Sequence, residues 1–328
     1  MLALDGRRDQ VRTLVVTIVS RTDVDPIVAP VVDVFTQQGF EFDKIVQLSG
    51  SRVRTNPKPE AYSCVEVWAH GSMVDDQQPD QMRQAFAKIA DDRNADIAFQ
   101  QVAGTAPEDR PKPRLFCFDM DSTLIQGEVI DELAKLAGVA DRVVAITASA
   151  MRGEIEFQES FRRRVGLLAG LPEARARELL NRIPLMEGAE KLFRTLHKMG
   201  AKTAILSGGF TFFGAYLEKR LGVNHVYANH LDVDPDGFVT GEVRGQIVDG
   251  ARKAQLLTEI AASEGIPLEN VVAVGDGAND LPMLNLAGMG VAFHAKPIVR
   301  ASAKFSMTHV GLDGLLYLLG IPDRDWAD

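Results

Sequence analysis

The first hundred residues alternate between short segments with an apolar residue at every second position and longer segments with apolar residues every three or four positions. The first pattern is typical of strands that bury one face, and the second of amphipathic helices. We predict strand, helix, strand, strand, helix and strand at residues 13–20, 25–39, 40–49, 61–71, 79–94 and 95–102. This order is typical of a ferredoxin-like βαββαβ unit of the α+β class.

A proline-rich segment, QVAGTAPEDRPKPR, follows this unit. Proline lacks the backbone amide hydrogen, so three prolines among charged residues leave little regular structure. We therefore predict an N-terminal domain at 1–104, a linker at 105–113 and a second domain at 114–328.

In the second domain, short apolar runs alternate with helical patterns, which is typical of an α/β doubly wound parallel sheet. The predicted strands cover residues 114–120, 202–209, 270–277 and 288–295. Ligands bind beyond the carboxyl ends of such strands. Residues from about 128 to 186 are almost wholly helical and too long for one crossover. We interpret this segment as a helical cap over the strand ends.

Length and composition narrow the function classes. A chain of 328 residues fits two domains, and its net charge of −9 argues against a nucleic-acid partner. No apolar run approaches the roughly 18 residues of a membrane span, so we expect no membrane partner and no secretory leader. Two cysteines, Cys64 and Cys117, are too few for a disulfide framework, which favours reduced thiols and a cytoplasmic location.

The first candidate for chemistry is the pair Asp119 and Asp121 in DMDST, directly after an apolar run. An aspartate at a strand end can act as a nucleophile if a hard cation screens its charge, and Mg²⁺ suits carboxylate and phosphate oxygens. A turn or helix cap is the alternative on local grounds. A calcium loop is excluded, since its sixth and twelfth positions would be Leu124 and Ile130.

Two further strand ends carry polar residues. Ser207 and Gly208 open a helix, where a hydroxyl and backbone amides can bind phosphate, although an ordinary helix start has the same pattern. Asp276 lies in GDGAND and could complete a metal shell, with Asn279 and Asp280 orienting its ligands or a nearby lysine. We also expect Asn279 to contact the substrate. Alone, Gly-Asp-Gly would indicate a turn.

The segments DMDST, SGG and GDGANDLPM, with Lys253 before the last, fall in the order of the four motifs of the haloacid dehalogenase superfamily. The chain resembles that superfamily from about 115 to 300. Without this context, Lys253 would be interpreted as a solvated lysine. The resemblance implies a doubly wound sheet with a cap.

The resemblance also implies a role for each matching residue. Asp119 would accept the phosphoryl group, and Asp121 would be the general acid and base. Ser207 and Lys253 would hold the phosphate. The Asp119 carboxylate, the Asp121 backbone carbonyl and Asp276 would bind Mg²⁺. An aspartate at position 121 is typical of the phosphatases in this group, because an acid there can protonate the leaving group.

Two residues of the cap point to the substrate. Arg164 falls on one helix face with Phe157, Phe161 and Leu168, where its guanidinium could pair with a substrate carboxylate or extend to water. Glu128 could face a substrate ammonium or favour a helix start. An arginine and a glutamate over a phosphate site would fit a zwitterionic amino-acid phosphate.

The segments DMDSTLIQGEVIDELA and FQESFRRRVGLL resemble the phosphoserine phosphatases within the superfamily. This implies hydrolysis of O-phospho-L-serine, the last step of serine biosynthesis. A related phosphatase or phosphotransferase acting on another small phosphate monoester remains an alternative. A non-enzymatic amino-acid sensor is a second alternative, which the intact catalytic residues oppose.

The N-terminal unit resembles the ligand-sensing domains called ACT. Its turn SRTDVDPI lacks the glycine that often lies beside the ligand in those domains. We expect a regulatory or stabilising role, with a possible homodimer through this unit. The segment DVDPDG at 232–237 is interpreted as a hairpin turn, and the histidines show no metal-ligand spacing.

Overall fold

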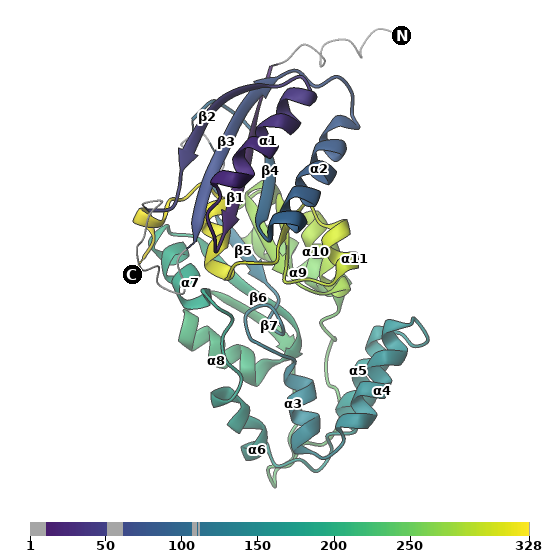
Figure 1. The fold of residues 1–328 in the computed structure, drawn as a ribbon. Coiled ribbons are helices and arrows are strands. Elements are labelled where there is room, and N and C mark those ends of the chain that lie inside the picture. Colours follow the sequence, from purple (N-terminus) through teal and green to yellow (C-terminus); the bar gives the residue numbers. More distant parts are fainter. Residues whose placement is uncertain (1–10, 51–61, 107–109, 111, 328) are drawn as a thin grey trace, which may run out of the picture. The chain divides into compact units, whose positions relative to one another are not determined.

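The structure is a computed structural model that describes residues 11–50, 62–106, 110 and 112–327 (Figure 1). Its contacts divide the chain into two compact units, Met1–Lys112 with Phe305–Asp328, and Pro113–Lys304. Each unit has a hydrophobic core of its own. None of the helices in the described parts of the chain is both long enough and apolar enough to cross a lipid bilayer.

The first unit is an antiparallel sheet with two helices on one face (Figure 1). Its elements are β1 (Arg12–Ser20), α1 (Asp25–Gln37), β2 (Glu41–Gln47), β3 (Ser63–Gly71), α2 (Gln78–Arg93) and β4 (Asp96–Val102). The strand order β2-β3-β1-β4 is that of a ferredoxin-like unit, which confirms the sequence prediction.

The alternating pattern of β1 explains how this sheet packs. Leu14, Val16 and Ile18 point to one face and join a core with apolar residues of both helices, among them Val31 and Phe86. Successive side chains of a strand point to opposite faces, so a period of two places these three on the helix side. The two helices therefore pack against the face of the sheet that the sequence pattern predicts to be apolar.

The C-terminal segment belongs to the first unit by its contacts. It contains β10 (Phe305–Met307) and α12 (Leu315–Leu318). The Asp96 carboxylate accepts the backbone N–H groups of Thr308, His309 and Val310 at 2.6, 2.9 and 3.1 Å. The sequence limits of 1–104, 105–113 and 114–328 remain a prediction. The contacts of the structure group residues 305–328 with the first unit instead, and Asp96, Tyr62 and Arg110 of that unit all bond to the segment.

The second unit is built on a parallel sheet with strand order β9-β8-β5-β6-β7. Its strands are β5 (Leu115–Phe118), β6 (Lys202–Phe210), β7 (His225–Asn229), β8 (Val271–Gly275) and β9 (Met289–Phe293). The helices that connect and flank them are α7 (Ala189–Lys198), α8 (Thr211–Leu221), α9 (Gly250–Ser263), α10 (Leu281–Leu286) and α11 (Pro297–Ser302). The sequence predicted four of these strands and missed β7.

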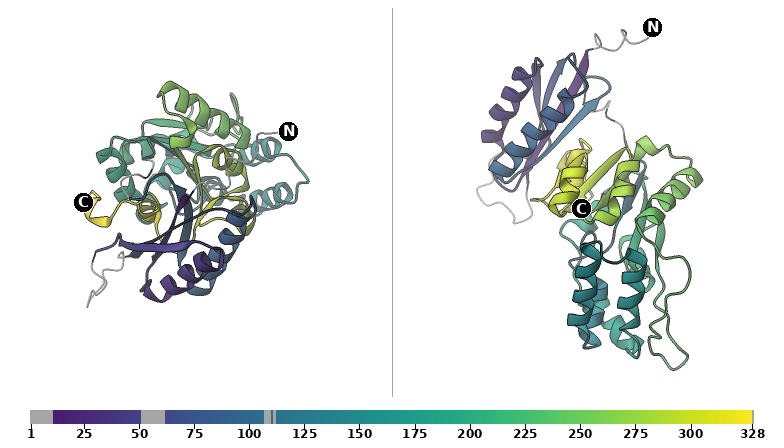
Figure 2. Two further views of the ribbon diagram at one scale, coloured as in Figure 1. Left: turned by 90° about the horizontal axis from the view of Figure 1, so that it is seen from above. Right: turned by 90° about the vertical axis from the view of Figure 1, so that its right-hand side faces the viewer.

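The segment between β5 and α7 forms the cap. Its helices are α3 (Val129–Leu136), α4 (Ala140–Met151), α5 (Phe157–Gly166) and α6 (Glu173–Arg177). They gather at the end of the sheet where β5 leads into them (Figures 1 and 2). The α/β fold with a helical cap agrees with the sequence prediction.

The segment at 232–237 is a hairpin turn, as the sequence predicted. Asp234 Oδ1 accepts the N–H groups of Asp236 and Phe238, and Val233 pairs with Val239 across the turn. The aspartate thus stabilises its own turn.

Candidate active site

Strand β5 ends at the two aspartates of the DMDST motif. Its residues are buried, and Asp119 extends the strand by donating its N–H to the carbonyl of Val274 at 2.9 Å. Two residues later, Asp121 Oδ1 accepts the N–H of Val129 at the start of α3, also at 2.9 Å. Asp119 and Asp121 are only 6% and 9% exposed. The start of the cap and the end of the strand therefore hold two nearly buried carboxyl groups.

Lys253 lies between two carboxylates near the start of α9. Its side chain is fully buried, with Nζ 2.8 Å from Asp119 Oδ1 and 2.7 Å from Asp280 Oδ1. Burial lowers the pKa of Lys253, but Asp119 and Asp280 raise it and outweigh burial, so the ammonium stays charged. Lys253 thus fixes the side chain of Asp119 and places a positive charge beside it.

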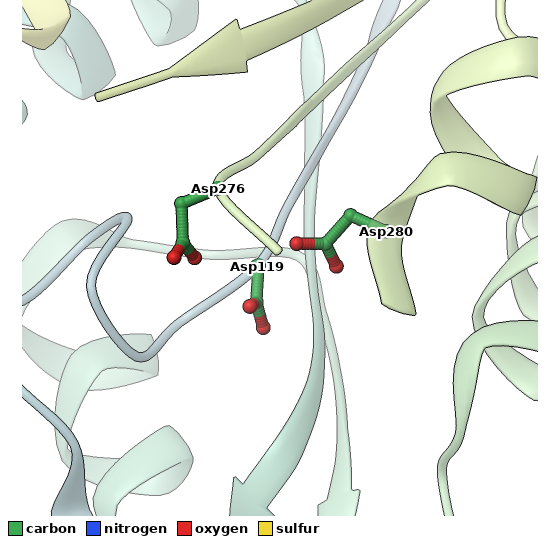
Figure 3. A group of neighbouring side chains, drawn as sticks. All are labelled: Asp119, Asp276 and Asp280. Atoms are coloured by element: carbon green, nitrogen blue, oxygen red, sulfur yellow. The ribbon is translucent and has the colours of Figure 1, made fainter. Parts of the chain in front are cut away.

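Three carboxylates converge at this point (Figure 3). One oxygen each of Asp119, Asp276 and Asp280 lie within 4.8 Å of one another. Burial and then Asp280 raise the pKa of Asp276 to about 7. Burial and Asp280 also raise the pKa of Asp119, which Lys253 opposes. One ammonium among three carboxylates leaves excess negative charge, an environment that suits a divalent cation with oxygen ligands.

The three carboxylates differ in their free oxygens. Asp280 Oδ1 accepts from Lys253 and Oδ2 accepts the N–H of Gly277 at 2.9 Å, so both are used. Asp276 Oδ1 accepts a longer bond, 3.3 Å, from the hydroxyl of Thr123. The geometry therefore suits Asp276 to metal binding and Asp280 to positioning Lys253. The contribution of the Asp121 carbonyl to the metal stays a prediction.

The carboxyl group of Asp121 is suited to proton transfer. Burial and then Glu128 raise its pKa to about 8, although the hydrogen bond from Val129 lowers it. An acid with that pKa is mostly protonated at neutral pH. A protonated carboxyl beside a phosphate site can give its proton to a leaving oxygen.

Ser207 and Gly208 lie in a bulge of β6. They do not open a helix as the sequence predicted, because β6 continues to Phe210 and α8 begins at Thr211. Leu206 pairs with Tyr227 of β7 and the next paired residue is Phe210, so residues 207–209 form no regular pairs. A side chain at Gly209 would collide with Asp121 Oδ2. The absence of a side chain therefore lets the bulge and the aspartate loop approach each other closely.

The two residues expected to read the substrate are both near the acidic loop. Glu128 is exposed and accepts a hydrogen bond from the Ser122 hydroxyl at 2.9 Å. Arg164 is partly buried, and its Nε has no hydrogen-bond partner within the described residues. Burial lowers the pKa of Arg164, whereas Asp131 and Glu128 raise it. A buried guanidinium nitrogen without a partner in the described protein is open to a partner from a ligand or from water.

Helix α5 reaches the bulge through Phe157. Phe157 begins this helix, and its Cζ would lie 3.4 Å from a Cβ at Gly208. Arg164 follows two turns later on the same face. The cap and the bulge thus face each other across the end of the sheet.

Asn279 contacts its own loop and the start of α9. Its Nδ2 is 3.4 Å from Asp280 Oδ1, and its carbonyl lies against Gly250 at the start of α9. This agrees with an orienting role in its own loop, while the predicted contact of Asn279 with substrate stays a prediction.

Sequence reasoning missed three polar residues of the site, which are Ser122, Thr123 and Asn229. Ser122 and Thr123 complete the DMDST motif and bond to Glu128 and Asp276, so their adjacency to the aspartates was an available signal. Asn229 contacts Gly208 from β7, which had no detectable strand pattern.

Comparisons with known proteins agree with this geometry. The family model of haloacid dehalogenase-like hydrolases matches residues 116–285. The chain is 44% identical over 242 residues to the phosphoserine phosphatase of Archaeoglobus fulgidus, which covers 74% of this chain and 69% of the relative. It is 46% identical over 239 residues to that of Haemophilus influenzae, with coverage of 73% and 74%.

Solved structures extend the similarity to the N-terminal unit. The unliganded crystal structure of a probable phosphoserine phosphatase from Vibrio cholerae matches with a TM-score of 0.72 and 32% identity. The match covers 95% of this chain and 88% of that one. The motif geometry, the family model and these relatives agree: the chain belongs to the haloacid dehalogenase-like hydrolases.

Proposed function

We propose that this chain hydrolyses O-phospho-L-serine to L-serine and inorganic phosphate. The observation that carries the proposal is the unsatisfied Nε of Arg164, on a cap helix that reaches the bulge at Gly208. A planar guanidinium suits a carboxylate, so this arrangement favours a phosphate ester that also bears a carboxylate. The relatives from Archaeoglobus fulgidus and Haemophilus influenzae are phosphoserine phosphatases, which supports the same substrate.

In the first step, Asp119 attacks the phosphorus atom. Asp119 Oδ1 accepts from Lys253 Nζ and from the N–H of Met120 at 2.7 Å, so Oδ2 is the better placed nucleophile. A bond forms between Oδ2 and phosphorus, and the bond from phosphorus to the serine oxygen breaks. Asp121 gives its proton to that oxygen, and L-serine leaves.

In the second step, water hydrolyses the aspartyl phosphate. Asp121, now a carboxylate, takes a proton from the water molecule as its oxygen attacks phosphorus. The bond between phosphorus and Asp119 breaks, which restores the carboxylate and releases phosphate. Lys253 and the Ser207 hydroxyl stabilise the negative charge on the phosphoryl oxygens in both steps.

The acidic cluster fits Mg²⁺, because its donors are carboxylate oxygens and its charge is only partly balanced by Lys253. Asp119 and Asp276 would hold the ion together with the Asp121 backbone carbonyl. When bound, Mg²⁺ supplies positive charge that lets an anionic nucleophile meet an anionic phosphate.

At the other end of the substrate, Arg164 binds the carboxylate and Glu128 binds the ammonium. The hydrogen bond from Ser122 orients Glu128, and Glu128 interacts electrostatically with Arg164. The negative charge of Glu128 complements the ammonium of a zwitterionic substrate, and the positive charge of Arg164 complements its carboxylate.

Phosphate release from O-phosphoserine, with and without Mg²⁺, tests the proposal. We expect turnover only with the metal, and no turnover with it would refute the function. A phosphotransferase acting on another alcohol is the alternative. Transfer of labelled phosphoryl group to an added alcohol in excess of hydrolysis would favour it.

The ferredoxin-like unit supports a homodimer and a regulatory role. Strand β2 is an edge of its sheet and carries two exposed apolar side chains, Phe42 and Ile45, 44% and 40% exposed. Exposed edges with apolar residues favour pairing with another chain. Light scattering would measure the mass of the protein in solution, and calorimetry of serine binding would test regulation.

Cys64 and Cys117 are buried free thiols, which supports a reducing, cytoplasmic location.

A further inference from the structure

The bulge of β6 has a buried polar neighbour that takes no part in the reaction described above. Asn229, the last residue of β7, is 3% exposed. It pairs along the sheet with Phe210, the residue directly after the bulge. Only Ala228 lies opposite residues 207–209 on β7. The backbone N–H and C=O groups of these three residues therefore cannot all form regular hydrogen bonds to that strand.

The carboxamide of Asn229 replaces part of that pairing. Its Nδ2 donates to the carbonyl of Gly208 at 2.8 Å, and its Oδ1 accepts the N–H of Val248 at 2.9 Å. Both ends of one buried side chain are thus bonded to backbone. A carboxamide with both ends fixed has a single preferred orientation, since exchanging its oxygen and nitrogen would break both bonds.

Fixing the Gly208 carbonyl also fixes the amide of Gly209. The two groups belong to one planar trans peptide, in which C=O and N–H point in opposite directions. In this structure the Gly209 N–H donates to Ser207 Oγ at 2.9 Å. Since Ser207 Oγ accepts this bond, its own O–H is left to donate elsewhere.

We propose that Asn229 is a positioning residue that orients the Ser207 hydroxyl toward the phosphate through the peptide between Gly208 and Gly209. The hydrogen bonds run in one direction, from Asn229 Nδ2 to the Gly208 carbonyl and from the Gly209 N–H to Ser207 Oγ. Bonds in such a chain polarise one another, so the hydroxyl becomes a better donor. This inference rests on the proposed phosphatase function, in which Ser207 holds the phosphate.

The second bond of Asn229 extends the same role to α9. Val248 directly precedes Asp249, the N-cap residue of the helix that carries Lys253. One carboxamide therefore connects the bulge with the start of the lysine helix. Asn229 therefore fixes the positions of the Ser207 hydroxyl and the Lys253 ammonium relative to each other, although it does not itself contact the phosphate.

The variant Asn229→Asp separates this role from simple packing. Aspartate has nearly the same shape and keeps an acceptor for Val248, but it places an oxygen against the Gly208 carbonyl. We expect inorganic phosphate, measured by calorimetry with Mg²⁺ held constant, to bind roughly tenfold more weakly, as expected for one lost hydrogen bond and its unsatisfied partner. In a Ser207→Ala background the same change should cause little further loss.

Asn224→Ala is the matched control. Asn224 also bonds backbone of β6, accepting the N–H of Thr203 at 2.9 Å, but at the opposite end of the strand. The variant Asn224→Ala should lower thermal stability and leave the affinity for phosphate at the wild-type value. Asn229→Ala, which introduces no charge, serves for the same comparison should Asn229→Asp not fold.

Two results would overturn the inference. One is wild-type phosphate affinity in a folded Asn229 variant, and the other is a loss that adds fully to that of Ser207→Ala. Because binding is measured directly, the two proposals fail separately. Suppose that the wild-type protein hydrolyses phosphoserine and that an Asn229 variant binds phosphate as tightly as wild type. These two results together would refute only the role of Asn229.

Discussion

Gln158 Nε2 donates a hydrogen bond to Asp249 Oδ2 at 2.7 Å. Asp249 is the N-cap of α9, where its Oδ1 accepts the N–H of Arg252 at 2.9 Å. Gln158 lies in the first turn of cap helix α5. One carboxylate thus joins the cap to the helix that carries Lys253, so a movement of the cap away from the sheet would break this bond.

This contact predicts an effect on substrate binding. Gln158→Ala should raise KM for phosphoserine about 3- to 10-fold, the contribution of one hydrogen bond of ordinary strength, since this bond is exposed to solvent, with a smaller change in kcat. Steady-state kinetics measures both. Glu159→Ala is the matched control, because Glu159 pairs with Arg163 on the exposed face of the same helix. Equal KM values for the two variants would contradict a closing role.

Arg164 should determine the preference for carboxylate-bearing substrates. Arg164→Ala removes the partner of the substrate carboxylate, so we expect kcat/KM for phosphoserine to fall about 10- to 100-fold. Phosphoethanolamine, which has no carboxylate, should lose far less. Arg162→Ala is the control, since Arg162 is exposed on the same helix. Equal losses on both substrates would refute the role of Arg164.

Lys253 should be required for stability as well as for turnover. Lys253→Met leaves Asp119 and Asp280 buried without their cation, and breaking a buried ion pair costs about 3–5 kcal/mol of unfolding free energy. Asp280→Asn in the same background should restore part of that stability but no activity. Urea unfolding and phosphate release measure the two effects separately. A stable, inactive Lys253→Met variant would show that Lys253 acts on the phosphate alone.

The pH dependence of this variant follows from the direction of the pKa shift. Burial and Asp280 raise the pKa of Asp119 even with Lys253 present. An acid whose pKa is higher in the folded than in the unfolded state stabilises the fold at low pH and loses that contribution as pH rises. Lys253 lowers the pKa of Asp119, so the variant Lys253→Met should raise that pKa further. The variant should therefore lose more stability relative to wild type at about pH 8 than at about pH 5. An equal loss at both values would contradict this.

The sequence predicted the sheet, and acidic residues meeting at its edge, for one physical reason. Strands buried on both faces, such as β5 and β8, appear as continuous apolar runs, and the polar residues that follow them must lie at the same edge. The sequence therefore predicts Asp119 and Asp276, far apart in the chain, at the same edge of the sheet.

Other parts could not be found in this way. Strand β7 begins with His225, ends with Asn229 and is only partly buried along most of its length, so it has no apolar run. The attachment of residues 305–328 to the first unit includes bonds from single side chains to backbone: Asp96 accepts three amides, and Arg110 donates to the carbonyl of Leu318. Such contacts between side chain and backbone leave no periodic pattern in the sequence.

Metal binding should depend on pH through Asp276. Burial and Asp280 raise its pKa to about 7 in the metal-free protein, so below that pH a cation must displace a proton. The apparent affinity for Mg²⁺ should rise up to tenfold per pH unit between about pH 5.5 and about pH 7, and level off above it. Calorimetry in two buffers of different ionisation enthalpy measures affinity and proton release together. Asp276→Asn, which has no proton to lose there, should bind weakly and with less pH dependence. Equal wild-type affinity at about pH 5.5 and about pH 7.5, without proton release, would exclude Asp276 as the titrating ligand.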